Sequence, residues 1–95
     1  MAQSRHGEYK VPGGKLVIID LDVAGDRLAN VSLSGDFFLE PPDALGDITR
    51  ALEGAPADAS EEELARLVEG GLREDAELIG FSAAAVATAV RRALR

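Results

Sequence analysis

Apolar and polar residues alternate along two neighbouring segments, 16–23 and 27–34, and this period of two predicts β-strands. The first segment would turn one wholly apolar face toward a core, made by Val17, Ile19, Leu21 and Val23. The second would contribute Ala29, Val31 and Leu33. Because only residues 24–26 separate the two segments, and Gly25 and Asp26 tolerate a tight turn, we expect an antiparallel hairpin.

The second half of the chain shows the helical period three times. The first helix is predicted to begin after Pro41-Pro42-Asp43, the second at a capping box of Ser60 and Glu63, and the third at Ser82. Their predicted inner residues are, in order, Leu45, Ile48 and Leu52; Leu64, Leu67 and Val68; and Val86, Ala89, Val90 and Leu94. Strands followed by helices predict an α+β fold, in which about three helices cover one face of the hairpin and of a short third strand at 37–39.

Residues 1–9 show no hydrophobic period, so we expect a flexible N-terminal arm followed by a single domain at 10–95. The length of 95 residues suits one domain with a modest core. No apolar run approaches the roughly 20 residues that cross a membrane. The chain has no cysteine, which excludes disulfides and thiolate metal sites within it. The simplest prediction is a cytoplasmic protein with no membrane partner.

Charge is distributed unevenly. The net charge of -7 argues against nucleic acid as a partner, because phosphate repels an acidic surface. Residues 1–15 nevertheless carry Arg5, Lys10 and Lys15 against the single acidic residue Glu8. The two lysines are the only ones in the chain, and they bracket Val11-Pro12-Gly13-Gly14.

Few residues suit catalysis. A lone His6 in a mobile arm is poor material for a metal site or for a Ser-His-Asp arrangement. Asp20 and Asp22 share one strand face and form a possible acid–base pair, but on a wet face they are more simply solubilising charges. We therefore predict no catalytic set within the chain.

The turn Gly13-Gly14-Lys15 invites comparison with a phosphate-binding loop. That loop needs a hydroxyl residue after its lysine and a helix following it, whereas Leu16 and a predicted strand stand here. Two interpretations stay open. The lysines flank a simple exposed turn, or they meet an anion that another protein holds.

Two of the four aromatic residues, Phe37 and Phe38, are adjacent. Neighbours in extended backbone point to opposite faces, so either the helices wrap both rings or one ring stays exposed. An exposed ring beside Leu16 and Ile18 would form a small apolar patch, and such patches typically mark partner surfaces.

The order of these features resembles a known module. KVPGGKLVIIDLDV, a short turn, RLANVSLSGDFF and a helical second half are together similar to the C-terminal accessory domain of bacterial-type lipoate–protein ligases, which in some organisms is a separate small subunit. The likeness runs from about Glu8 to the last helix and is densest at Lys10–Lys15 and Gly35–Phe38. It implies a fold similar to that of SufE- and NifU-like proteins, although zero cysteines exclude iron–sulfur chemistry here.

The resemblance also implies a function. In that family a large domain binds lipoate and ATP with magnesium and holds the catalytic lysine, while the accessory domain is needed to form lipoyl-AMP before transfer to lipoyl carrier domains. The large domain has no counterpart in these 95 residues, so the resemblance implies no cofactor bound alone and either a separate catalytic subunit as partner or a chain that is a fragment of a longer ligase. Ligase activity is expected only together with the catalytic part, in a heterodimer in the first case.

Residue by residue, the resemblance places Lys10, Gly13, Gly14 and Lys15 near the adenylate site of the partner. We further expect Leu16, Ile18, Phe37 and Phe38 at the partner interface, with one phenylalanine in the core and the other on the docking surface. The alternative is a small protein-interaction module with no ligand or catalytic role.

Overall fold

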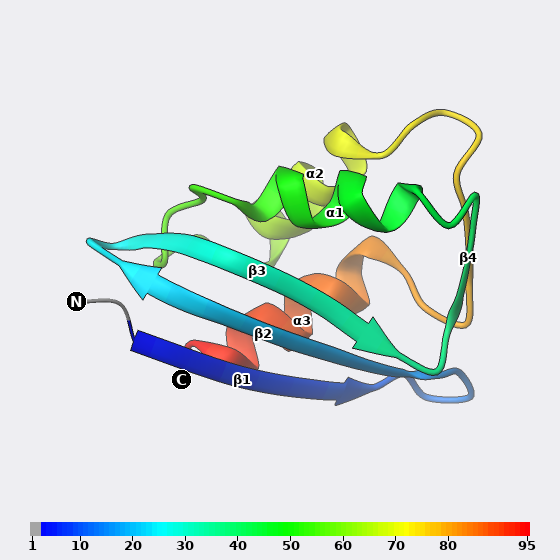
Figure 1. Cartoon of the computed structure of the whole chain (residues 1–95). Helices are drawn as coiled ribbons and strands as arrows, with labels where there is room; N and C mark the ends of the chain where they lie inside the picture. The colour runs from blue at the N-terminus through cyan, green and yellow to red at the C-terminus, as the bar shows by residue number, and fades with distance from the viewer. Residues whose placement is uncertain (1–2) are drawn as a thin grey trace.

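The computed structural model describes residues 3–95 as a sheet covered by helices on one face (Figure 1). The elements are β1 (Gln3–Lys10), β2 (Leu16–Ala24), β3 (Arg27–Gly35), β4 (Phe38–Glu40), α1 (Ala44–Leu52), α2 (Glu61–Gly71), β5 (Glu77–Ile79) and α3 (Ala83–Ala93). β1, β2 and β3 form an antiparallel sheet in that order, and β4 pairs antiparallel with β5. The α+β class, the hairpin and the three helices are confirmed.

The flexible arm expected at residues 1–9 is wrong for the residues described. Positions 3–10 form β1, which pairs with β2 along its whole length, from Gln3 opposite Val23 to Lys10 opposite Leu16. The strand escaped prediction because its helix-facing positions are Arg5, Gly7 and Tyr9, which give no aliphatic alternation. Residues 1 and 2 of the expected arm lie outside the described part of the chain.

The small Gly7 is what lets α3 lie directly on β1. A Cβ atom at this position would come within 2.5 Å of the Ala93 backbone nitrogen and would also collide with the Ala89 carbonyl oxygen. α3 meets the sheet with a run of small buried residues, Ala85, Ala89 and Ala93 among them. Close approach of two backbones therefore replaces side-chain interdigitation at this point of the core.

The inner face of β3 differs from the prediction because of a β-bulge. Asp20 lies opposite Ser32 but Asp22 lies opposite Ala29, so one extra residue sits in β3. Asn30 adopts a φ of 50°, and the bulge reverses which side chains point inward. Leu28 is therefore buried in place of the predicted Ala29.

The carboxylate of Glu53, just after α1, stabilises this bulge. It accepts the backbone N–H groups of Asn30 and Val31 at 3.0 and 2.6 Å. The backbone following α1 then pairs with the start of β3, since the Leu28 N–H donates to Ala55 at 2.9 Å. The exposed edge of β3 is covered here by the chain itself.

The third strand expected at 37–39 exists as β4 but does not extend the main sheet. It pairs instead with β5, a three-residue strand that no periodic pattern in the sequence predicts. The similarity to SufE- and NifU-like proteins remains a prediction.

The helices bury most of their predicted inner residues between the two layers. Ile48, Leu52, Leu64, Val68, Val86, Ala89 and Val90 are buried. The capping box of Ser60 and Glu63 is present at the start of α2. Leu67 was expected inside but is 39% exposed, and Leu45 and Leu94 are half-buried. Within residues 3–95, the helices are too short and too polar for any of them to traverse a lipid bilayer.

Candidate functional site

The turn that joins β1 to β2 is closed by its own backbone. The Val11 N–H donates to the Lys15 carbonyl at 3.0 Å, and the Gly14 N–H donates to the Val11 carbonyl at 2.8 Å. Gly13 has a φ of 71°, a conformation that side chains disfavour. The Lys10 ammonium folds over the turn and donates to the Gly14 carbonyl at 2.6 Å. The four predicted residues of the turn thus lie together.

Lys15 differs from Lys10 because its backbone, and not its ammonium group, makes the hydrogen bond that fixes its position. Its backbone N–H donates to the Gly80 carbonyl at 2.9 Å, which fixes the turn against the segment after β5. Gly80 has a φ of 88°, and a Cβ there would collide with the Lys15 side-chain stem. Gly14 is equally constrained, since its Cβ would lie 2.7 Å from the Gly80 oxygen. Within residues 3–95 no hydrogen bond or ion pair engages the Lys15 ammonium, so it remains available to an anion.

The segment Gly35-Asp36-Phe37-Phe38 spans the junction of β3 and β4 and lies beside the start of β2. Gly35 has a φ of 149° and lies so close to Leu16 that a Cβ would collide with the Leu16 carbonyl oxygen. The Asp36 carboxylate accepts the backbone N–H of Leu16 at 2.7 Å. Together these two residues end β3 and tie it to the first residue of β2.

The two phenylalanines separate as expected for neighbours in extended backbone. Phe37 is half-buried and stacks on buried Phe81, with ring centroids 4.0 Å apart and an interplanar angle of 29°. Phe38 points outward and is 63% exposed. The prediction of one inner and one outer ring is confirmed, whereas its role in docking stays a prediction.

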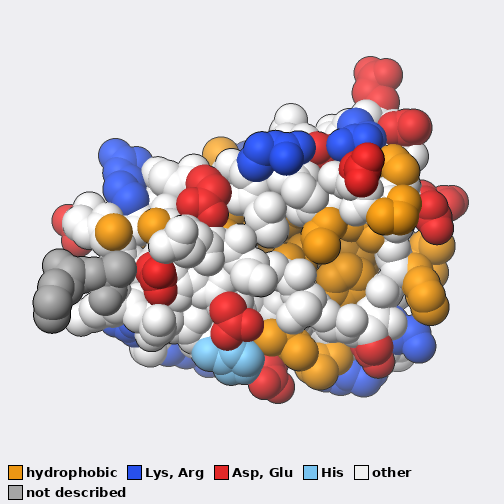
Figure 2. All heavy atoms as spheres, in the orientation of Figure 1, with side chains coloured by type: hydrophobic (Ala, Val, Ile, Leu, Met, Phe, Trp, Pro, Cys, Tyr) orange, Lys and Arg blue, Asp and Glu red, His pale blue; other side chains and the backbone are white. Residues whose placement is uncertain are grey.

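The apolar neighbour of Phe38 in the structure is Ile79, which the sequence did not suggest. The two residues are directly opposite in the β4–β5 ladder, and Ile79 is 44% exposed. Figure 2 shows hydrophobic side chains gathered at the end of the molecule where β4 lies, bordered by acidic ones. Since Gly80 follows Ile79 and contacts Lys15, the exposed pair lies next to the lysine turn.

The other two residues predicted at the interface lie elsewhere on the sheet. Leu16 and Ile18 are half-buried on the face away from the helices, opposite Lys10 and Glu8 of β1.

His6, placed by the sequence in a mobile arm, is held on β1 between two carboxylates. Its Nδ1 lies 2.6 Å from Asp20 and its Nε2 lies 2.7 Å from Glu8. These hydrogen bonds, the one to Glu8 foremost, raise the pKa of His6. Asp20 and Asp22 carry separate partners, since Asp22 accepts from Ser4 and Asn30. In residues 3–95 no cluster of three or more His, Asp or Glu side chains is arranged to hold a metal ion.

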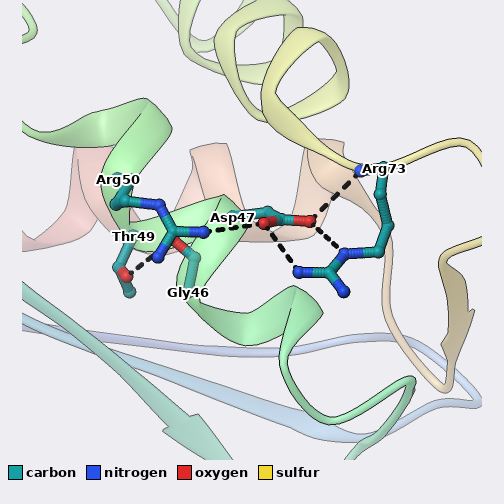
Figure 3. A network of polar contacts seen from close by, with 5 residues as sticks. All are labelled: Gly46, Asp47, Thr49, Arg50 and Arg73. Carbon is teal, nitrogen blue, oxygen red and sulfur yellow. Dashed lines mark hydrogen bonds and ion pairs between the residues drawn. The ribbon is translucent and has the colours of Figure 1, made fainter.

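A second polar network joins α1 to the segment after α2 (Figure 3). Asp47, only 9% exposed, receives the Arg73 side chain at 2.8 and 3.1 Å and the Arg73 backbone N–H at 3.2 Å. Arg50 approaches the same carboxylate from the other side at 2.9 Å. The Arg73 hydrogen bonds lower the pKa of Asp47 to about 2. The network fixes the chain between α2 and β5, and therefore the approach of β5 to β4.

One solved structure relates this fold to a known system, while no protein-family model and no curated protein matches the chain. The similar chain belongs to an archaeal lipoylation system, a bipartite lipoate protein ligase and its E2 lipoyl domain from Thermoplasma acidophilum. The two chains share 23% identity and a TM-score of 0.64, over 100% of this chain and 96% of the other. The likeness extends over the whole chain and agrees with the family resemblance of the sequence motifs, and at this identity it establishes a shared fold.

Proposed function

We propose that the chain is a non-catalytic accessory subunit of a lipoate–protein ligase. It acts with a separate catalytic subunit, in which the lipoate carboxylate attacks the α-phosphorus of ATP, releasing pyrophosphate and forming lipoyl-AMP. The amine of a carrier-domain lysine then attacks the acyl carbon, AMP leaves, and the amine loses a proton. The observation that carries the proposal is the likeness over the full chain to a component of a bipartite ligase system.

The lysine turn would act on the activation step. Lys15 offers an ammonium that is free within the described chain, on a turn whose position is set by Gly14 and Gly80. A positive charge held in place beside a phosphate stabilises the charge that develops when pyrophosphate leaves. Covering the mouth of the site also excludes the water that would hydrolyse the acyl-adenylate. Lipoate and ATP with magnesium would be bound by the catalytic subunit.

The exposed pair Phe38 and Ile79 would dock the catalytic subunit next to this turn. An aromatic ring that is 63% exposed beside an exposed isoleucine is the kind of anchor that binding interfaces bury. Because Gly80 follows Ile79 and accepts the backbone N–H of Lys15, docking at this pair would place Lys15 over the adenylate site of the partner.

The proposal is tested by replacing both lysines with alanine and measuring lipoate-dependent pyrophosphate exchange with a catalytic subunit. We expect exchange to fall at least tenfold while the complex still forms. The matched control is Arg27→Ala with Arg66→Ala, which removes the same charge far from the turn. Exchange unchanged in the lysine variant would refute the role of the turn, and no dependence of exchange on the chain at all would refute the accessory function.

A second candidate is a protein-interaction module with no ligand or catalytic role, which the exposed Phe38–Ile79 pair also favours. The variant Phe38→Ala with Ile79→Ala separates the two, with Leu67→Ala as a control at another exposed apolar residue. Under the accessory function it loses binding and exchange together. A pure interaction module would lose binding in this variant yet tolerate the loss of both lysines.

A further inference from the structure

Seven of the ten basic residues form no ion pair with an Asp or Glu side chain within residues 3–95. Of the ten Lys and Arg residues, three arginines pair with carboxylates, at Asp47 twice and at Glu62 once. Of the seven without an ion pair, Arg27 and Arg91 donate to the backbone carbonyls of Gly54, Ala57 and Ala59, between α1 and α2. The other five lie on β1, on the turn after it, and in or just after α3. They are Arg5, Lys10, Lys15, Arg92 and Arg95.

Four of these five line one edge of the sheet. Arg5 and Lys10 belong to β1, Arg92 lies in the last turn of α3, and Arg95 follows the end of that helix, which packs beside β1. Arg5 donates to the Arg95 backbone carbonyl at 3.4 Å. The separation of five residues along β1 spreads the charges over roughly 17 Å. We call Arg5, Lys10, Arg92 and Arg95 the basic edge.

The basic edge is partly preorganised. The Arg92 guanidinium lies 4.9 Å from the centroid of the Tyr9 ring and donates to the Glu8 carbonyl at 3.2 Å. A guanidinium held on an aromatic face keeps a fixed orientation and loses less freedom when it binds. Tyrosine and arginine are also the residues that most often dominate binding interfaces. α3 itself contains no acidic residue that would compete for these arginines.

The acidic side chains nearest the three arginines lie on the other face of the sheet, the outer face that Lys10 shares. Glu8 and Asp20, on the face of the sheet away from the helices, are engaged by His6, and Asp22 is engaged by Ser4 and Asn30. A nucleic acid backbone laid along β1 would meet this acidic face as well, in a chain of net charge -7. Separate carboxylates on a folded protein can reach the edge without crossing that face, and they match the planar guanidinium bidentately.

We propose that the basic edge binds an acidic protein domain, and that this domain is the acceptor of the lipoyl group. The identity of the acceptor rests on the proposed function, whereas the acidic chemistry of the partner rests on the edge itself. Lys10 is at the end of the basic edge that adjoins the turn between β1 and β2. An acceptor domain bound along β1 would therefore lie next to the adenylate of the proposed complex.

The test separates binding of the acceptor from activation. The variant Arg5→Gln, Arg92→Gln and Arg95→Gln is compared with Arg27→Gln, Arg50→Gln and Arg66→Gln, which has the same net charge. The probes are an acidic E2 lipoyl domain in its unlipoylated form and a thymidine oligonucleotide, with binding measured by calorimetry at low and high salt. Circular dichroism establishes that both variants fold.

We expect the edge variant to bind the lipoyl domain roughly tenfold more weakly than the control, because three exposed charge pairs are lost. The difference should shrink at high salt. In the coupled reaction the edge variant should slow lipoyl transfer and leave pyrophosphate exchange unchanged. Equal binding by the two variants, or tighter binding of the oligonucleotide than of the lipoyl domain, would overturn the inference. Pyrophosphate exchange that does not depend on the chain at all would instead refute the proposed function and leave the binding result standing.

Discussion

Replacing Gly7 by alanine tests whether β1 is an integral strand on which α3 rests. The new Cβ would lie 2.5 Å from the Ala93 nitrogen and would collide with the Ala89 oxygen. Overpacking costs about 1–3 kcal/mol, and the upper end applies because the obstructing atoms are backbone. Alanine also restricts the unfolded chain, which offsets about 0.4–1 kcal/mol. The expected net loss is about 2 kcal/mol in the free energy of unfolding, or roughly 8–16 °C in Tm.

The assay is thermal unfolding followed by circular dichroism, with Gly70→Ala as a matched control. A Cβ at Gly70 meets nothing within 4 Å, and the residue lies in the last turn of α2. Alanine there should raise stability by up to about 1 kcal/mol through helix propensity. Opposite shifts in the two variants are therefore expected. A Gly7→Ala protein as stable as the wild type would refute the close packing of α3 on β1, and with it the origin of the basic edge.

Two further predictions concern pH. The pKa of His6 is raised in the folded chain by Glu8 and Asp20. The contribution of His6 to stability is therefore full below its ordinary pKa of 6.5 and is lost as the pH rises through the folded pKa. His6→Gln should make Tm less dependent on pH between these two pKa values. Conversely, the pKa of Asp47 falls from 3.8 to about 2, so its contribution is present above 3.8 and disappears as pH falls toward 2. Asp47→Asn should therefore lower Tm near neutrality and lose the wild-type decline in acid, and an unchanged decline would refute the Arg73 pairing.

The sequence predicts the elements whose buried residues are aliphatic and recur with the period of a strand or of a helix. β2 and the three helices follow that rule, and Ser60 and Ser82 cap their helices as expected. β1 does not follow it, because its core-facing positions are Arg5, Gly7 and Tyr9. Its burial comes from a close backbone contact and from an arginine lying over a ring. Neither contact leaves a periodic trace in the sequence.

The candidate site was only partly predictable for a related reason. Glycines at 13 and 14, the adjacent lysines and the double phenylalanine are local features, and they are visible in one short stretch each. Ile79 was not predictable, since its importance arises from pairing with Phe38 across the β4–β5 ladder. Leu28 was assigned to the wrong face because a one-residue bulge reverses the alternation on which the assignment depended.

The arrangement of basic residues along one edge of the sheet depends on β1, the strand that the sequence pattern does not predict. If residues 3–10 were a free arm, Arg5 and Lys10 would be mobile cations with no fixed relation to the end of α3. Pairing β1 to β2 places them on an edge that α3 completes with Arg92 and Arg95. The same pairing closes the turn that carries Lys15 onto Gly80. One strand therefore orders both the proposed adenylate contact and the proposed acceptor contact, and a variant that detaches β1 should lose the two together.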